Sequence, residues 1–285
     1  MRNCLLLLVY LWSAVYTPAH TQFPITVSAD LPSFFYTGDQ PKLQFLLNNT
    51  DSQEKTGNLQ LELFDAVRKQ PVDGWFYNQL ANQYFTLAPG ERNAVRFPIT
   101  IPNLFTGSIA WQLTVRIDTA QLILRGTIEV QVTKQEEPTA SDNVVGAKLG
   151  LHILSHPTTT ERVQEKAITP FATQPIGQAI LIRVKLHLGK THDSCRLELP
   201  LAAGLQPTGR VLLFKQGKST LRHRLSTSDT AITTTFYGLT PGTYQFDYYF
   251  KARYPGQYLI PASRMFFTKV WTREMITTSS TIEID

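Results

Sequence analysis

The hydrophobic and polar positions of this chain follow the pattern of short β-strands separated by turns. From residue 23 to residue 133 no helical period lasts beyond two turns, and strand-length apolar segments recur between turns rich in glycine, asparagine and proline. Leu59, Leu61 and Leu63 alternate with Gln60 and Glu62, which predicts a strand with one buried and one solvated face. Six or seven short strands in roughly 110 residues indicate a β-sandwich. The strands are expected at 25–29, 42–48, 59–64, 93–101, 109–117 and 122–133.

The second half of the chain repeats this strand pattern. Four aromatic residues alternate from Tyr244 to Phe250, which places them on one face of a strand. The turn Tyr254-Pro255-Gly256 then reverses the chain, and Pro261 ends the next strand so early that we expect that strand at a sheet edge or with a bulge. A second all-β domain is therefore predicted. Its strands are expected at 149–154, 179–188, 196–199, 209–214, 232–237, 244–253, 258–261 and 278–284.

The ends of these patterns give the domain organisation. Arg2, the apolar run from Cys4 to Val15 and the small residues around His20 are typical of a signal peptide, and the run is too short for a transmembrane helix. A polar, proline-containing stretch separates the two strand-rich regions and reads as a linker. The predicted fold class is all-β, with two tandem antiparallel β-sandwich domains after a signal peptide. The expected boundaries are a signal peptide at 1–21, a first sandwich at 22–133, a linker at 134–147 and a second sandwich at 148–285.

Charge and cysteine content exclude some classes of function. The chain has a formal net charge of +5, but its basic residues are scattered, the densest group being Arg222-His223-Arg224. Nucleic-acid binding needs a concentrated basic stripe or a known module, so it is not expected. Without the signal peptide the chain keeps one cysteine, Cys195, which cannot form an internal disulfide. Stability must therefore come from burial of apolar side chains.

The second half contains three ordered sequence blocks, Ile176 to Leu186, Leu199 to Pro207 and Leu239 to Phe267. These blocks resemble the C-terminal macroglobulin domain of bacterial alpha-2-macroglobulins. The resemblance covers about 110 residues and implies a macroglobulin-type sandwich. In the third block Arg253 stands where the family has lysine or arginine, and Met265 and Phe266 occupy a Met-Tyr position.

The first half is similar to the macroglobulin domain that precedes the thioester region in the same family. The matching residues are Leu31 to Asp39, Leu43 to Asn48, and the turn from Leu87 to Glu91. Ser33 departs from the arginine usual in the family. The resemblance implies that two macroglobulin-like domains follow each other in this chain.

The resemblance does not extend to the chemistry of the family. Its protease trap needs a thioester formed within a Cys-Gly-Glu-Gln run, whereas Cys195 lies in Ser-Cys-Arg-Leu-Glu with no glutamine placed to close the ring. The stretch between the two domains is too short to hold a thioester domain. We therefore expect no covalent protease trapping by this chain and no enzymatic activity.

Other candidate chemistry is weak. His152 and His156 have a spacing that suits a metal on a helix, but no third ligand lies near them before Glu161. His192, Asp193 and Ser194 contain the residue types of a catalytic triad, but neighbours in a predicted hairpin loop rarely reach triad geometry. The sequence thus predicts no metal site and no cofactor, and a hydrolase that uses His192 and Asp193 stays as an alternative.

Function is therefore expected through protein–protein contact. The hypothesis is an exported periplasmic or extracellular protein that does not span the membrane. It acts in the cell envelope as an accessory or scaffold protein or as a non-covalent protease-binding module, and its partner is a protease or another envelope component. Alternatives are a carbohydrate-binding or adhesin-type sandwich, which would need Trp75, Phe76 and Tyr77 exposed and coplanar, and a decayed macroglobulin without activity. The candidate contact residues are an aromatic turn and a sheet edge, since edge strands offer unpaired backbone groups. These residues are Trp75, Phe76, Tyr77, Tyr258, Leu259 and Ile260.

Overall fold

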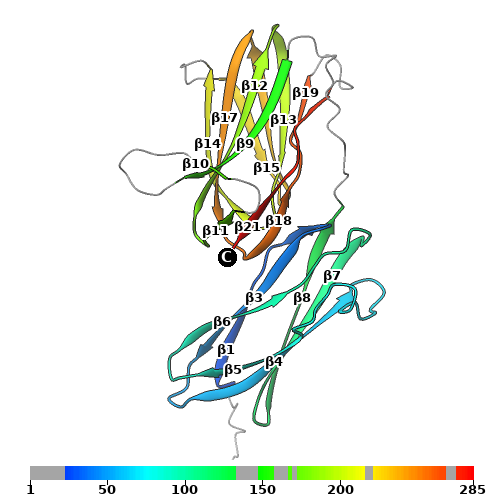
Figure 1. Cartoon of the computed structure of the whole chain (residues 1–285), viewed down its shortest axis with the longest axis vertical. Coiled ribbons are helices and arrows are strands. Elements are labelled where there is room, and N and C mark those ends of the chain that lie inside the picture. The colour runs from blue at the N-terminus through cyan, green and yellow to red at the C-terminus, as the bar shows by residue number, and fades with distance from the viewer. Residues whose placement is uncertain (1–22, 133–146, 157–165, 169–171, 216–220, 268–273) are drawn as a thin grey trace, which may run out of the picture.

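The computed structural model shows two β-sandwiches joined end to end (Figure 1). It describes residues 23–132, 147–156, 166–168, 172–215, 221–267 and 274–285. These residues form strands and turns without any helix, which confirms the all-β prediction. The expected signal peptide and nearly all of the expected linker lie outside the described residues.

The first sandwich consists of two facing sheets. One has the strand order β2-β8-β7-β4-β5, and in the other β3 pairs with β1 and β6. All pairs are antiparallel except β2 with β8, which is parallel. The strands are β1 (Ile25–Asp30), β2 (Phe34–Tyr36), β3 (Gln40–Asn49), β4 (Lys55–Asp65), β5 (Asn82–Leu87), β6 (Arg92–Pro98), β7 (Gly107–Ile117) and β8 (Ala120–Gln131).

Apolar alternation forms the core between these sheets. Leu59, Leu61 and Leu63 are fully buried, as the pattern predicts. Phe45 lies at the centre and packs edge-on against Trp111, with ring centroids 5.4 Å apart. Gly126 lies under the indole, where an added Cβ would meet Trp111 at 2.6 Å. The core therefore depends on a missing side chain as well as on large ones.

The second sandwich has two five-stranded sheets, β10-β9-β12-β17-β14 and β15-β16-β13-β19-β20. The aromatic face predicted from Tyr244 to Phe250 is confirmed: Tyr244, Phe246, Tyr248 and Phe250 all lie in the core. The buried Tyr248 hydroxyl bonds Thr234 Oγ1 of the facing sheet at 2.9 Å. The strands are β9 (Ala147–His156), β10 (Lys166–Ala167), β12 (Ala179–Leu188), β13 (His192–Pro200), β14 (Leu205–Lys215), β15 (His223–Thr227), β16 (Ala231–Leu239), β17 (Gly242–Ala252), β19 (Arg264–Phe267) and β20 (Glu274–Ile276).

Three further strands connect the two sandwiches. They are β11 (Thr173–Gln174), β18 (Gly256–Ile260) and β21 (Ser280–Ile284), and with β1, β3 and β6 they form one continuous six-stranded sheet. β18 lies between β3 and β21 (Figure 1) and pairs with β3 at Gly256 and Gln257, so the expectation of a sheet edge is wrong for the start of this strand, while its later residues have β21 alone as a partner. The local sequence predicts that the strand ends early at Pro261, but it cannot predict the pairing with β3, which lies more than 200 residues upstream.

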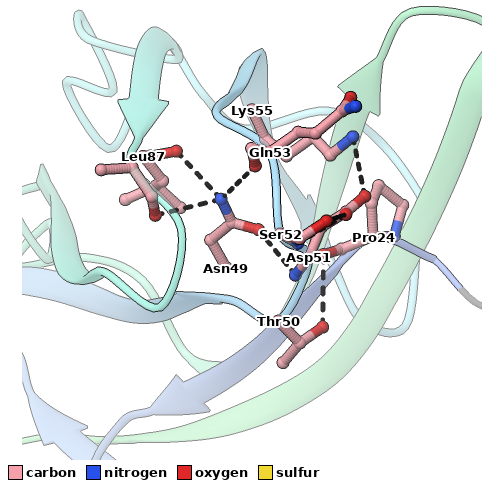
Figure 2. A network of polar contacts seen from close by, with 9 residues as sticks. Pro24, Asn49, Thr50, Asp51, Ser52, Gln53, Lys55 and Leu87 are labelled. Atoms are coloured by element: carbon pink, nitrogen blue, oxygen red, sulfur yellow. Dashed lines mark hydrogen bonds and ion pairs between the residues drawn. The ribbon is translucent and has the colours of Figure 1, made fainter.

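At the far end of β3 from this connection, a buried asparagine ties two turns together (Figure 2). The Asn49 amide donates to the carbonyls of Gln53, Leu87 and Ala88 at 2.9 to 3.0 Å, and its oxygen accepts from the backbone N–H of Asp51 at 3.0 Å. Every polar atom of this side chain therefore has a partner inside the protein. We assign Asn49 a structural role.

Candidate functional site at the domain junction

The turn at 72–80 presents two of the predicted contact residues to solvent and buries the third. Trp75 and Tyr77 are 45% and 63% exposed, whereas Phe76 is completely buried. The Trp75 and Phe76 rings lie at 74° to each other, so the three aromatics do not form the coplanar platform that a carbohydrate-binding surface would need. The prediction that Phe76 is a contact residue is wrong. Phe76 lies in the core, where its ring packs edge-on against the ring of Phe105.

The predicted contact residues Tyr258, Leu259 and Ile260 also differ from the prediction. Tyr258 and Ile260 are buried and Leu259 is half-buried, and the backbone of this segment is paired with β21. The Tyr258 hydroxyl donates to the carbonyl of Pro255 at 2.9 Å. These side chains hold the junction together and do not offer a free contact surface.

Hydrogen bonds fix the shape of the 72–80 turn. The Asp73 carboxylate accepts from the backbone N–H of Leu63 at 3.1 Å and from the amide of Asn78 at 2.8 Å. The Asn78 amide also donates to the carbonyl of Leu61 at 3.1 Å. With Phe76 anchored in the core, this network holds the backbone between the two anchors in one conformation.

Tyr77 is strained by this arrangement. Its φ is +53°, in the left-handed region. The left-handed conformation costs a residue with a Cβ roughly 1–2 kcal/mol of conformational energy, so the surrounding contacts must impose it on Tyr77. The result is an aromatic ring held out into solvent by a turn whose neighbouring residues, Phe76 and Asn78, are both buried.

The junction itself centres on Asp39, which is 1% exposed. One carboxylate oxygen accepts from the backbone N–H of Tyr36 at 2.8 Å, and the other from the N–H of Leu259, in the second sandwich, at 2.7 Å. Burial raises the pKa of Asp39 to about 7, and the two N–H donors oppose this shift only in part. One buried carboxylate thus connects the two sandwiches.

Ion pairs surround this contact. Asp285 pairs with Lys42 at 2.9 Å and with Arg96 at 3.0 Å, and the Lys42 contact lowers the pKa of Asp285. Arg253 pairs with Asp30 of the first sandwich at 3.1 Å. These groups are partly exposed, so each pair contributes only about 0.2–1 kcal/mol. Their main effect is to fix the orientation of the sandwiches.

A groove with a volume of about 560 Å³ lies beside the junction, within the usual range for ligand sites. Its floor comes from the shared sheet and includes Gln40, Gln257 and Glu283, and its wall includes Tyr77 and Leu80 from the first sandwich. Of the six predicted residues, Tyr77 lines the groove, and the residues that precede the predicted strand segment, Gly256 and Gln257, line it as well. No local sequence signal marks the others, because the groove forms only when β3, β18 and β21 pair.

A known family resembles most of the second sandwich. Residues 155–266 match the family model described as the Bacterial Alpha-2-macroglobulin MG10 domain. The second sandwich is therefore similar to that domain, and the predicted resemblance to bacterial alpha-2-macroglobulins is confirmed there.

Solved structures extend the likeness in fold to both sandwiches. An Escherichia coli alpha-2-macroglobulin fragment from domain MG7 to the C-terminus superposes with a TM-score of 0.61 at 7% identity, covering 92% of this chain and 99% of that one. Salmonella alpha-2-macroglobulin reacted with methylamine gives 0.62 at 7% identity, covering 92% of this chain and 40% of that one. The native Escherichia coli protein gives 0.58 at 8% identity, with 92% and 40% coverage. At this identity the likeness concerns the fold. No curated protein matches the sequence.

The candidate catalytic residues of the second sandwich do not form a site. His192 and Asp193 begin strand β13 rather than lying in a loop, and consecutive strand residues point to opposite faces. The His192 ring packs on Phe267 at 4.3 Å between centroids. Cys195 is buried, which raises the pKa of its thiol to about 12 and leaves it protonated at neutral pH.

The described residues offer neither a metal site nor a membrane-spanning helix. They contain no group of three or more His, Cys, Asp or Glu side chains that could hold a metal ion. The side chain of His156, one of the two histidines with metal-type spacing, lies outside the described set. No described helix is long and apolar enough to cross a membrane.

Proposed function

We propose that this chain is an exported, non-enzymatic alpha-2-macroglobulin-like protein that acts in the cell envelope by non-covalent contact with a protein partner. The partner is a protease or another envelope component. The observation that carries the proposal is the junction, where a sandwich similar to a macroglobulin MG10 domain and the preceding sandwich share one sheet and together form a groove. A surface built from two domains exists only while their relative position is held.

The exposed residues at this junction are of the kind that dominate protein interfaces. Tryptophan and tyrosine are enriched among interface residues with large binding energies. Trp75 and Tyr77 are presented on a turn fixed by Asp73 and Asn78, so little conformational entropy is lost when a partner binds. This preorganisation supports a binding role for the turn.

Two features support a role without covalent chemistry. Cys195 is enclosed in the core of the second sandwich with a raised thiol pKa, which is the opposite of what a nucleophile or thioester precursor requires. The sequence also contains no Cys-Gly-Glu-Gln run. The location in the envelope rests on the apolar run from Cys4 to Val15 and on the macroglobulin resemblance.

The proposal is tested by capture with residues 22–285 as bait. Envelope extract and a panel of proteases are offered to the wild type, to Tyr77→Ala and to Tyr84→Ala, a matched control since Tyr84 is 85% exposed on β5, outside the groove. We expect a protein released by denaturation that binds wild type and the control but binds Tyr77→Ala less. Failure of all three to retain any protein at micromolar concentration would reject the proposal.

A further inference from the structure

The floor of the junction groove is a lateral row of polar side chains contributed by three strands. Gln257 of β18 lies directly opposite Gln40 of β3 on one side and Glu283 of β21 on the other. Directly opposed residues of antiparallel strands project from the same face of a sheet. The row therefore presents two amides and one carboxylate side by side, with residues from both sandwiches.

These floor groups lack partners within the described part of the chain. No hydrogen bond or ion pair joins the side chains of Gln40, Gln257 or Glu283 to another described residue, whereas Lys42, which also lines the groove, pairs with Asp285 at 2.9 Å. Asp285 also pairs with Arg96 at 3.0 Å. Among the residues that line the groove Glu283 is the one acidic side chain, and it is half-buried.

The wall supplies the apolar part of the site. Tyr77 and Leu80 line it and are 63% and 53% exposed, which is unusual for large apolar side chains placed next to each other. The strained backbone of Tyr77 holds its ring at this position. A tyrosine face beside a carboxylate suits a cationic side chain, whose alkyl stem packs on the ring while its charged end reaches the acid.

We propose that this groove binds an extended peptide segment of the partner that carries an arginine or lysine side chain. The inference rests on the proposed function and names the chemistry its partner must present. The cationic end pairs with Glu283, the stem packs on Tyr77 and Leu80, and the amides of Gln40 and Gln257 bond the peptide backbone, since each amide both donates and accepts. An acidic segment is disfavoured because Glu283 would repel it.

Peptide pools test this ligand class. Residues 22–285 are titrated with acetylated, amidated hexapeptide pools that have Arg, Lys, Ala or Glu fixed at the third position and mixed residues elsewhere, and isothermal titration calorimetry reports binding. We expect the Arg and Lys pools to bind about tenfold more tightly than the Glu pool, a difference of about 1.4 kcal/mol. Absence of binding by every pool at about 1 mM, or equal binding by all four, would overturn the inference.

Matched variants locate the effect. Glu283→Gln should bring the Arg and Glu pools to similar affinity, while Glu54→Gln, an exposed carboxylate away from the junction, should leave the preference intact. Tyr77→Ala should weaken all pools together. Thermal unfolding confirms that each variant is folded. A preference for Arg that survives Glu283→Gln would also overturn the inference.

The peptide test and the capture test fail separately. If the intact chain still captures its partner when Tyr77→Ala and Glu283→Gln are combined, the proposed function holds and the groove is not its contact site. If the chain captures no partner but the pools bind with the expected preference, the groove is a peptide site and the proposed envelope function is wrong.

Discussion

The carboxylate of Asp39 and the backbone N–H of Leu259 lie 2.7 Å apart, although 220 residues separate them in the sequence. β18 pairs with β3 only at Gly256 and Gln257, so further along β18 the N–H of Leu259 has no opposing strand on that side. The Asp39 carboxylate takes the place of the missing strand. This contact ends the shared sheet without leaving a buried backbone donor unsatisfied.

Removal of this carboxylate should destabilise the protein. Asp39→Ala leaves the N–H groups of Tyr36 and Leu259 without an acceptor, and each unsatisfied buried group costs about 1–3 kcal/mol. Chemical denaturation should show a loss of at least about 2 kcal/mol in the free energy of unfolding. The control Glu54→Gln should change it by less than about 0.5 kcal/mol. Equal stability of Asp39→Ala and the control would contradict the role of Asp39.

Stability should also depend on pH through this residue. The pKa of Asp39 is raised from 3.8 to about 7 in the folded state, so between these values the folded chain holds a proton that the unfolded chain has released. The stability contributed by this proton is complete below pH 4 and is lost as pH rises through about 7. Tyr36 and Tyr258 face Asp39 and stay neutral over this range, because burial raises the pKa of both.

The comparison of wild type with Asp39→Asn isolates this effect. His152 and His192, whose pKa values are lowered, also make stability depend on pH, but their contribution is the same in both proteins and cancels in the comparison. Unfolding free energies measured from pH 4 to pH 8 should fall more steeply with pH in the wild type. Parallel curves for the two proteins would show that Asp39 has an ordinary pKa.

The close approach of β3 and β18 should not tolerate a Cβ at Gly256. Its φ is +138°, and an added Cβ would lie 2.6 Å from Pro41 Cα and 2.7 Å from the Gln40 carbonyl oxygen. Gly256→Ala should therefore cost several kcal/mol or separate the sandwiches. Gly209→Ala is the matched control, because Gly209 also has a positive φ, +74°, but no atom within 4 Å of an added Cβ.

Limited proteolysis gives the readout for this pair. We expect cleavage between the sandwiches to be faster in Gly256→Ala than in Gly209→Ala, in step with the loss of stability. If the two substitutions raise the cleavage rate equally, the positive φ of the two glycines explains the loss of stability. The pairing of β3 with β18 would then contribute nothing measurable.

The asparagine network at the other end of β3 should contribute to stability without affecting binding. Asn49→Ala removes the donors that satisfy the carbonyls of Gln53, Leu87 and Ala88 and should cost about 2–3 kcal/mol. Asn93→Ala, at an exposed position on β6, should cost less than about 1 kcal/mol. Peptide-pool affinity should be the same in both variants. A changed affinity in Asn49→Ala would mean that the Asn49 network affects peptide binding in the groove through β3.

Local patterns predicted the fold well and the site poorly, for a physical reason. Alternation identifies the buried faces at Leu59 to Leu63 and at Tyr244 to Phe250, because a strand's faces depend on neighbouring residues alone. The position of β18 depends on pairing with β3, which no local period reports. Phe76 lies in the core between two exposed aromatics, on a turn where Tyr77 takes a left-handed conformation, and a tyrosine gives no sequence signal for that.

The most direct test of the composite groove is site-specific cross-linking. A photo-crosslinking amino acid is placed at position 77 or, as a control, at position 84 of residues 22–285, and the protein is irradiated with envelope extract or protease. Position 77 should give a discrete cross-linked product that the Arg peptide pool suppresses and the Glu pool does not, and position 84 should give none. Products that are identical at the two positions, or unaffected by the Arg pool, would contradict the groove as the partner site.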